Sequence, residues 1–505
     1  MTDFTLKIDR SRLDALLATA RERARARKRP VLVTLTQRAA TLDPLAALES
    51  VSLASESNDL VASLVAEGRM YWTCPRDGFA LAGVGAVAAF APEGDKRFSS
   101  VDRDWAALLD GAVTENPDDG TPGLGPILMG GFAFDASTPQ SGLWEGFASA
   151  HMIVPRLLFT SIGETSWLTV SAIVGTGGEL DTDLDVLTTL LNETGGVTLR
   201  CDNNPPIDET AGSKLQFRES RSAADWRSLV STAVRHICAG KMQKVVLARD
   251  VHGTATDDID VFGTLEHLRD THRNSFVFGY WRGDTAFIGA SPERLVRLDG
   301  NDVRASSLAG TEKRGATPEE DSALAALLLA SSKDLAEHSA VRDALYDALS
   351  EISDDVEASE TPSLLTLPHL HHLHTPVRAR LREGHSLLDI VSRLHPTPAV
   401  GGTPREAALR FIKDHEQLDR GWYAAPIGWI GRGSGEFAVA LRSAVIDGPD
   451  ATLFAGCGIV ADSDPELEYN ESVLKLRPMQ MAISAATSET REDLSEVGST
   501  AEVSR

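Results

Sequence analysis

Pairs of acidic residues stand one helical turn apart in two separate stretches of the sequence. The pairs are Asp334 with Glu337 and Glu468 with Glu471. Residues three apart lie on one face of a helix, so two such faces that meet could hold a hard divalent cation. Mg²⁺ fits this pattern because it binds one or two carboxylates together with ligand oxygens and water. The same spacing is also that of two solvated helix faces, with Glu471 and Lys475 as a surface ion pair, and spacing alone favours this plainer interpretation.

A lysine and a glutamate stand where their surroundings could change their protonation. Lys244 begins the apolar β-like run KVVLA. A lysine removed from water can become neutral and act as a base, although a lysine at the start of a strand more often extends to solvent. Glu293 ends the segment GASPE, at a sharp turn after a strand. In a partly apolar site its carboxyl group could keep its proton and serve as a general acid, whereas in water it would be an ordinary strand-end acid.

Three further segments have compositions that suggest binding sites. The turn SSLAGT at 306–311 is built of small residues, and its backbone could approach a ligand closely. The segment PHLHHLHTP places His372 and His374 on one face of a strand, but no third ligand stands nearby, so a zinc site is not predicted. GVGAVA matches a dinucleotide-binding pattern, yet it lies in β-like text with no helix after it. Neither a Walker A motif nor a GxSxG motif occurs.

The overall charge excludes several classes of partner. The chain has 505 residues, with 49 Lys and Arg against 73 Asp and Glu, for a net charge of −24. Such acidity argues against nucleic acid and against an anionic membrane surface as the main partner. The four cysteines are far apart, and we find neither a signal-like N-terminus nor an apolar run long enough to span a bilayer. We therefore expect a cytoplasmic protein with a small ligand.

The elements that must position the candidate residues change character along the chain. A helical pattern covers 9–28, and short β-like runs separated by Gly, Pro and Asp follow from 30 to about 200. This text is typical of large, mostly antiparallel sheets. Polar text at 202–220 is the best candidate for a linker. The second half alternates strands and helices, including a long helical pattern over 318–352 and a final helix over 465–484. We expect one large α+β unit.

Nine segments, in order, resemble the chorismate-utilising enzymes, and among them the isochorismate synthases most. They are QKVVLARD, FIGASPERLVRL, SLAGTEKRG, SSKDLAEH, LHHLHTPV, LHPTPAVGGTP, GWYAAPIGWI, FAVALRSAVI and FAGCGIVADSDPELEYNESVLKL. Upstream, GGFAFDAS and GLWEGFASAHMIVPRLLF resemble the N-terminal half of these enzymes. The resemblance implies large, mostly antiparallel β-sheets wrapped by helices. The expected organisation is an N-terminal amphipathic helix (1–29), a β-rich half (30–210), a chorismate-binding catalytic region (220–484) and a disordered tail (485–505).

The resemblance implies roles for the residues that match the family's motifs. Lys244 takes the place of the base that activates water, and Glu293 takes the place of the general acid. Glu337 and Glu471 match the Mg²⁺ ligands, with Asp334 and Glu468 as their one-turn neighbours. The positions around the substrate carboxylates are matched by Arg442, Gly456, Gly458 and Lys475. The positions along the ring are matched by Gly310, Thr311 and His372, and a pocket position near the ring hydroxyl is matched by Ala399.

These matches imply an isomerase that uses Mg²⁺, adds water at C2 of chorismate and releases the C4 hydroxyl, with migration of the ring double bond. The isochorismate formed would feed menaquinone or siderophore biosynthesis. Anthranilate-forming relatives usually carry Gln where Lys244 stands and a GAPK-type loop where HPTPAVGGTP stands, so we expect no amidotransferase partner, and a monomer. Salicylate-forming relatives share the catalytic set, so a salicylate synthase is the alternative, followed by a catalytically silent chorismate-binding protein. Cys457 and Ala425 depart from the residues that are commoner in the family.

Overall fold

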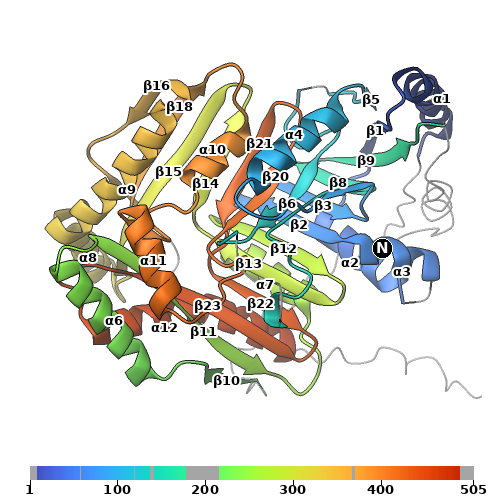
Figure 1. Cartoon of the computed structure of the whole chain (residues 1–505). Helices are drawn as coiled ribbons and strands as arrows, with labels where there is room; N and C mark the ends of the chain where they lie inside the picture. Colours follow the sequence, from blue (N-terminus) through green and yellow to red (C-terminus); the bar gives the residue numbers. More distant parts are fainter. Residues whose placement is uncertain are drawn as a thin grey trace, which may run out of the picture.

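Two large β-sheets form the framework of the molecule in this computed structural model, which describes residues 8–56, 58–118, 120–136, 142–177, 215–366 and 370–488 (Figure 1). The first sheet has the order β10 (Gln216–Glu219), β11 (Lys244–Thr254), β23 (Asp450–Ile459), β22 (Ser443–Asp447), β13 (Thr285–Ser291), β12 (Phe276–Arg282), β2 (Arg69–Cys74), β3 (Phe79–Val84), β8 (Leu157–Ile162), β9 (Thr165–Val174), β1 (Val31–Ala39) and β5 (Val113–Glu115), with β19 (Gly402–Thr403) beside β11. The second has the order β16 (Ser353–Ala358), β18 (Leu370–Leu381), β15 (Asp302–Lys313), β14 (Arg294–Asp299), β21 (Ser434–Val439), β20 (Pro426–Ile430), β6 (Leu128–Phe132), β7 (Ala150–Val154) and β4 (Ala88–Phe90), with β17 (Ser363–Thr366) beside β18.

Both sheets combine strands from the early and the late parts of the chain. In the first sheet, β2 pairs with β12, so that Trp72 stands opposite Phe278. In the second sheet, β6 pairs with β20, with Gly130 opposite Gly428. Among the described strands, all pairings are antiparallel except that of β1 with β5. The expected α+β class with large, mostly antiparallel sheets is confirmed.

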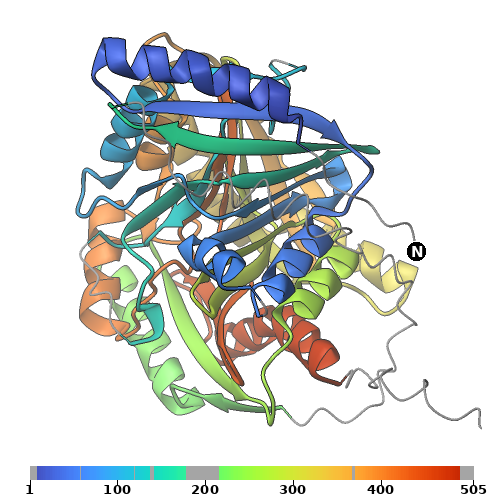
Figure 2. The same ribbon diagram turned by 90° about the vertical axis from the view of Figure 1, so that its right-hand side faces the viewer.

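Apolar side chains fill the space between the sheets and the space between each sheet and its helices. The largest buried cluster draws residues from both sheets, and the rings of Phe79 in β3 and Trp429 in β20 meet across it at 5.4 Å. The helices are α1 (Arg10–Arg27), α2 (Pro44–Ala54), α3 (Asp59–Glu67), α4 (Arg97–Leu109), α6 (Ala223–Cys238), α7 (Val261–Thr271), α8 (Pro318–Ala330), α9 (Ser332–Ser350), α10 (Leu387–Leu394), α11 (Arg405–His415) and α12 (Pro465–Ser488). Figure 2 shows α1 lying along β1, where Leu13 and Leu17 are buried.

The helical pattern over 318–352 is two helices rather than one. Ser331, between α8 and α9, has an extended backbone, and its hydroxyl accepts a hydrogen bond from the backbone N–H of Asp334 at 3.2 Å. A serine that caps a helix in this way satisfies a backbone donor that would otherwise lack a partner, so it starts a new helix. The prediction of one long helix was therefore wrong, and the correction places Asp334 and Glu337 in the first two turns of α9.

The ends of the predicted organisation fall partly outside the described residues. Of the predicted tail, residues 489–505 lie outside them, and so do residues 202–214 of the predicted linker. The final helix continues to Ser488, four residues beyond its predicted end at 484. Within the described ranges, no helix is long and apolar enough to cross a membrane.

Candidate active site

Lys244 and Glu337 meet where the first sheet approaches α9. Lys244 is the first residue of β11, and its buried side chain donates a hydrogen bond from Nζ to Oε1 of Glu337 at 2.7 Å. The strand is held on one side by β23 and on the other by the short strand β19, where Thr403 stands opposite Lys244. The lysine predicted as the base and a glutamate predicted as a metal ligand are therefore in direct contact.

Two glycines of β23 leave the space that this contact needs. A Cβ atom at Gly458 would lie 2.9 Å from Cε of Lys244 and 3.1 Å from Oε1 of Glu337. A Cβ atom at Gly456 would lie 2.8 Å from the carbonyl oxygen of Leu247 and 3.0 Å from the hydroxyl of Tyr423. At Gly456 the short contact is with backbone, so glycine is required there, whereas a side chain at Gly458 would force Lys244 to shift.

Glu293 follows β13 and is held in place by the backbone. Its N–H donates to the hydroxyl of Ser291 at 3.2 Å, and its carbonyl oxygen accepts from the N–H of Val439 at 3.0 Å. Burial raises the pKa of Glu293 to about 7, against the opposing effect of the positive charges of Lys244, Arg442 and Lys475. At neutral pH a large fraction of this carboxyl group therefore carries a proton that it can donate.

Two cations lie near Glu293. Burial lowers the pKa of Arg442, whose φ of +52° places its backbone in the left-handed region between β21 and β22. Lys475 on α12 donates to the carbonyl oxygen of Gly456 at 3.1 Å and pairs with Glu471 at 2.5 Å. Burial acts to lower the pKa of Lys475, but the carboxylate of Glu471 outweighs burial and keeps the pKa above its ordinary value. Both cations are suited to bind carboxylates.

The first turns of α12 bring two acids and a thiol together. Cys457, Glu468 and Glu471 each offer an atom within 4.8 Å of the others. Glu468 is buried and accepts from the hydroxyl of Ser463 at 2.7 Å. Burial raises the pKa of the Cys457 thiol, so the sulfur stays protonated and is a poor ligand for a hard cation. The carboxylate oxygens fit Mg²⁺, which binds oxygen donors.

The second sheet contributes a wall built around a bulge in β15. Gly310 has a φ of +78° and interrupts the register with β18, and a Cβ atom there would lie 3.1 Å from Cβ of Asp334. The next residue, Thr311, bonds through its hydroxyl to Nδ1 of His372 at 3.0 Å. Burial lowers the pKa of His372 to about 3, with further lowering by Arg442 and Lys475. The imidazole is therefore neutral, and its buried Nε2 has no hydrogen-bond partner among the described residues.

Three residues singled out in the sequence make contacts other than those described above. The carboxylate of Asp334 contacts the hydroxyl of Ser331 at the start of α9, and so serves the helix cap. His374 stands two residues after His372 on β18 but lines a different pocket, with Arg294 and Arg76. Ala399 is half-buried in the loop before β19, and its N–H donates to Thr397 at 3.2 Å.

Sequence reasoning missed a buried ion pair that joins this loop to β11. Arg420 pairs with Glu416 at 2.6 Å and donates to the carbonyl oxygens of Val400 at 2.9 Å and Val246 at 2.7 Å. Glu416 also accepts from the N–H of Ala248 at 2.8 Å. The spacing of four residues between Glu416 and Arg420 was a signal that could have pointed to the pair.

Tyr423 was also missed. Its ring stacks on Phe454 at 5.2 Å, and burial raises the pKa of its hydroxyl to about 12. The charges that act on it include Arg420, Lys475 and Arg442, so the hydroxyl stands close to the two cations of the site. Its position beside Gly456 comes from the packing of β23 against the segment before β20, which no local pattern in the sequence indicates.

Comparison with known proteins shows the family of the chain. A family model described as chorismate binding enzyme matches residues 18–484. The salicylate biosynthesis isochorismate synthase of Pseudomonas aeruginosa is 37% identical over 463 residues, which cover 92% of this chain and 92% of that protein. The isochorismate synthase MenF of Bacillus subtilis is 34% identical over 458 residues, which cover 90% of this chain and 93% of that protein.

A solved structure shows the same fold. The menaquinone-specific isochorismate synthase MenF of Escherichia coli superposes with a TM-score of 0.72 at 24% identity, covering 93% of this chain and 100% of that one. The family model covers most of the chain, and the two relatives above match along nearly their whole length. The chain belongs to the family of chorismate binding enzymes.

Proposed function

We propose that the protein is an isochorismate synthase, an isomerase that converts chorismate to isochorismate. Water adds at C2 of the ring, the double bond migrates, and the C4 hydroxyl leaves. The observation that carries the proposal is that one site holds both a buried lysine, Lys244, and a buried carboxyl group, Glu293, whose pKa burial raises to about 7 although the charge of Lys244 acts on it. Relatives that are 37% and 34% identical over nearly the whole chain are named as isochorismate synthases, which supports the same reaction.

Lys244 is the proposed base. Its Nζ is removed from bulk solvent at the start of β11, and it can take a proton from water once the ammonium group paired with Glu337 has given up its own. The contact with Glu337 fixes the position of Nζ, and Gly458 leaves the room for it. Lys244 thus holds the attacking water on one face of the ring.

Glu293 is the proposed general acid for the departing C4 hydroxyl. A carboxyl group with a pKa of about 7 holds its proton in a substantial fraction of molecules at neutral pH and can still release it. The bonds from its backbone to Ser291 and Val439 fix the turn that carries it. We place Glu293 and Lys244 on opposite faces of the ring, so that the group taking a proton and the group giving one do not neutralise each other.

Binding of the dianionic substrate is assigned to the remaining residues of the proposed site. Arg442 and Lys475 would bind the carboxylates, beside Gly456 and Gly458. Gly310, Thr311 and His372 would line the ring, with the free Nε2 of His372 as a hydrogen-bonding group, and Ala399 would stand near the ring hydroxyl. Glu337 and Glu471 would hold Mg²⁺, with Asp334 and Glu468 as neighbours. When bound, Mg²⁺ supplies positive charge to the ring carboxylate.

The remaining features of the proposal follow from the substrate. No ammonia is consumed in the reaction, so we propose that the protein needs no amidotransferase partner. We also propose that it is a monomer, that it acts in the cytoplasm, and that its product supplies menaquinone or siderophore biosynthesis. The test is to incubate the purified protein with chorismate, with and without Mg²⁺, and to separate the products. Isochorismate alone is expected. Salicylate with pyruvate would indicate a salicylate synthase, and unchanged chorismate would indicate a silent binding protein.

A further inference from the structure

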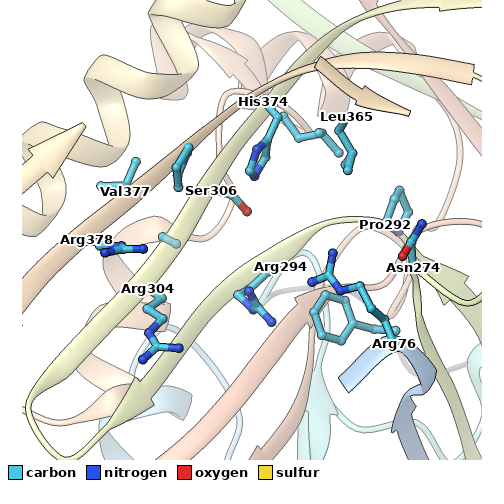
Figure 3. A pocket seen from close by; sticks show the side chains of 14 residues that line it. Arg76, Asn274, Pro292, Arg294, Arg304, Ser306, Leu365, His374, Val377 and Arg378 are labelled. Atoms are coloured by element: carbon cyan, nitrogen blue, oxygen red, sulfur yellow. The ribbon is translucent and has the colours of Figure 1, made fainter. Parts of the chain in front are cut away.

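A cavity of about 210 Å³ lies beside the candidate active site and is lined by arginine side chains. Its positively charged lining residues are Arg76, Arg294, Arg304 and Arg378, and His374 also lines it. Figure 3 shows Arg304, Arg294 and Arg76 in a row, with His374 pointing toward them from β18. No acidic residue lines this cavity among the described residues. In a chain of net charge −24, so local a concentration of positive charge requires an explanation.

Two of these arginines are neutralised by acids outside the cavity. Arg294 pairs with the buried Glu436 at 2.8 Å and lies 3.7 Å from Asp77. Arg76 pairs with the same Asp77 at 3.5 Å. Arg294 also stacks over the ring of Phe276, 5.2 Å from its centroid. These contacts fix the direction of Arg294, whose guanidinium group faces the cavity.

The other two arginines lack such partners. Arg304 in β15 and Arg378 in β18 stand directly opposite each other across the two strands. On the outer sides of this exposed pair, Arg297 of β14 stands opposite Arg304 and lies 3.9 Å from Glu436, and Glu357 of β16 stands opposite Arg378. Neither Arg304 nor Arg378 makes an ion pair within 4.0 Å in the part of the chain that the structure describes. Like charges at opposed positions destabilise a sheet, and a bound anion would remove that repulsion.

The rest of the lining is apolar except for Asn274 and Ser306. Phe276, Pro292, Leu308 and Leu365 form this part of the wall, and burial lowers the pKa of His374, as do Arg294 and Arg76. Guanidinium groups bind carboxylate and phosphate oxygens in a bidentate manner, and a flat aromatic ring suits the apolar part. The volume is below the range of roughly 300–1,000 Å³ that is typical for drug-sized ligands, so the ligand must be small.

We propose that this cavity is a second anion-binding site, separate from the site around Lys244 and Glu293, and that it takes a small dianion carried on an apolar ring. Its wall is continuous with the candidate active site along β18 and along the turn between β13 and β14. Pro292 lines the cavity and Glu293 is the next residue, while His374 lines the cavity two residues after His372. A molecule bound in the cavity would therefore contact Pro292, the residue next to the proposed general acid.

The test is calorimetric titration of the full-length protein with isophthalate, a ring that bears two carboxylates, with benzoate and inorganic phosphate as comparison probes. The double variant Arg304→Gln/Arg378→Gln removes the two unpaired charges. The matched control is Arg380→Gln, which removes an exposed arginine from the same strand outside the cavity. Arg442→Gln removes a cation of the candidate active site, so binding at the two sites can be told apart.

We expect isophthalate to bind more tightly than benzoate or phosphate, and the double variant to weaken its binding at least tenfold. Arg380→Gln should leave that binding unchanged, and Arg442→Gln should remove only binding at the candidate active site, so that isophthalate still binds this variant. Without ligand, the double variant should melt at the same or a higher temperature, because the repulsion between Arg304 and Arg378 has been removed. If the double variant does not fold, the single variant Arg378→Gln takes its place. Isophthalate binding that survives the double variant, or that is lost in Arg442→Gln, would overturn the proposal. If phosphate binds more tightly than isophthalate, the proposal that the ligand carries an apolar ring is wrong.

Discussion

Nζ of Lys244 lies 2.7 Å from Oε1 of Glu337, so the proposed base and a proposed Mg²⁺ ligand share one contact. Both side chains are largely shielded from solvent, with exposed fractions of 6% and 16%. A buried carboxylate needs a positive charge beside it, and here the ammonium group supplies that charge. A cation that binds Glu337 must therefore compete with Lys244.

Substitution of Lys244 by Ala is expected to strengthen Mg²⁺ binding by about tenfold or more, because a buried carboxylate that loses its partner is left uncompensated by a few kcal/mol. Turnover should be lost in the same variant. Calorimetric titration with Mg²⁺ measures the affinity, with the exposed neighbour Lys241→Ala as the control. Weaker Mg²⁺ binding in Lys244→Ala than in Lys241→Ala would show that Glu337 is not a metal ligand.

Glu293→Gln is expected to lower turnover about 10²- to 10⁴-fold, because glutamine is similar in shape but cannot give a proton to the leaving hydroxyl. Chorismate binding, measured by calorimetry, should change little. In the wild-type protein, kcat should fall as pH rises through about 7, since Glu293 then loses its proton. A variant with near-normal kcat, or a wild-type kcat that holds its value to pH 9, would contradict this role.

The same carboxyl group should make stability depend on pH. Its folded pKa of about 7 lies above the ordinary value of 4.5, so the stability that it contributes is present below pH 4.5 and is lost as pH rises through 7. From pH 5 to pH 8 the wild type should lose roughly 3 kcal/mol relative to Glu293→Gln. Melting temperatures of the two proteins at both pH values measure this difference, with the exposed Glu319→Gln as the control. An equal gap between wild type and Glu293→Gln at both pH values would argue against a buried, neutral Glu293.

Gly458→Ala tests the close approach of β23 to the lysine. The added Cβ would lie 2.9 Å from Cε of Lys244, so the amine must shift, and turnover should fall about 10- to 100-fold. The melting temperature should change little, because the atoms that must move belong to a flexible side chain. Steady-state rates and thermal melts on the same sample separate the two effects. An unchanged rate would mean that the position of Nζ does not limit the reaction.

Local sequence patterns predicted the helices and strands that carry the site. Lys244 was expected at the start of a strand and Glu293 at a turn after a strand, and the structure places both there. The fold class followed from the same alternation of short β-like runs. The break at Ser331 was not foreseen, because a helical pattern continues on both sides of it and the cap depends on one hydroxyl.

Contacts between distant parts of the chain could not be predicted in this way. Tyr423 meets Gly456, and Arg304 faces Arg378, only because particular strands pair in a particular register. The ion pair of Glu416 and Arg420 was missed, and its role in tying Val400 to β11 depends on where that pair is buried. Such relationships arise from packing between residues far apart in the sequence, and hydrophobic periodicity indicates only local structure.

The origin of the new hydroxyl oxygen tests the central claim most directly. In the proposed reaction, the hydroxyl at C2 comes from a water molecule that Lys244 deprotonates, and the C4 hydroxyl leaves with a proton from Glu293. Chorismate incubated with the protein and Mg²⁺ in ¹⁸O-labelled water should give isochorismate with one ¹⁸O atom at C2, read by mass spectrometry, and Lys244→Ala should give none. Isochorismate formed without label would mean that the hydroxyl moves within the ring, and would contradict the account.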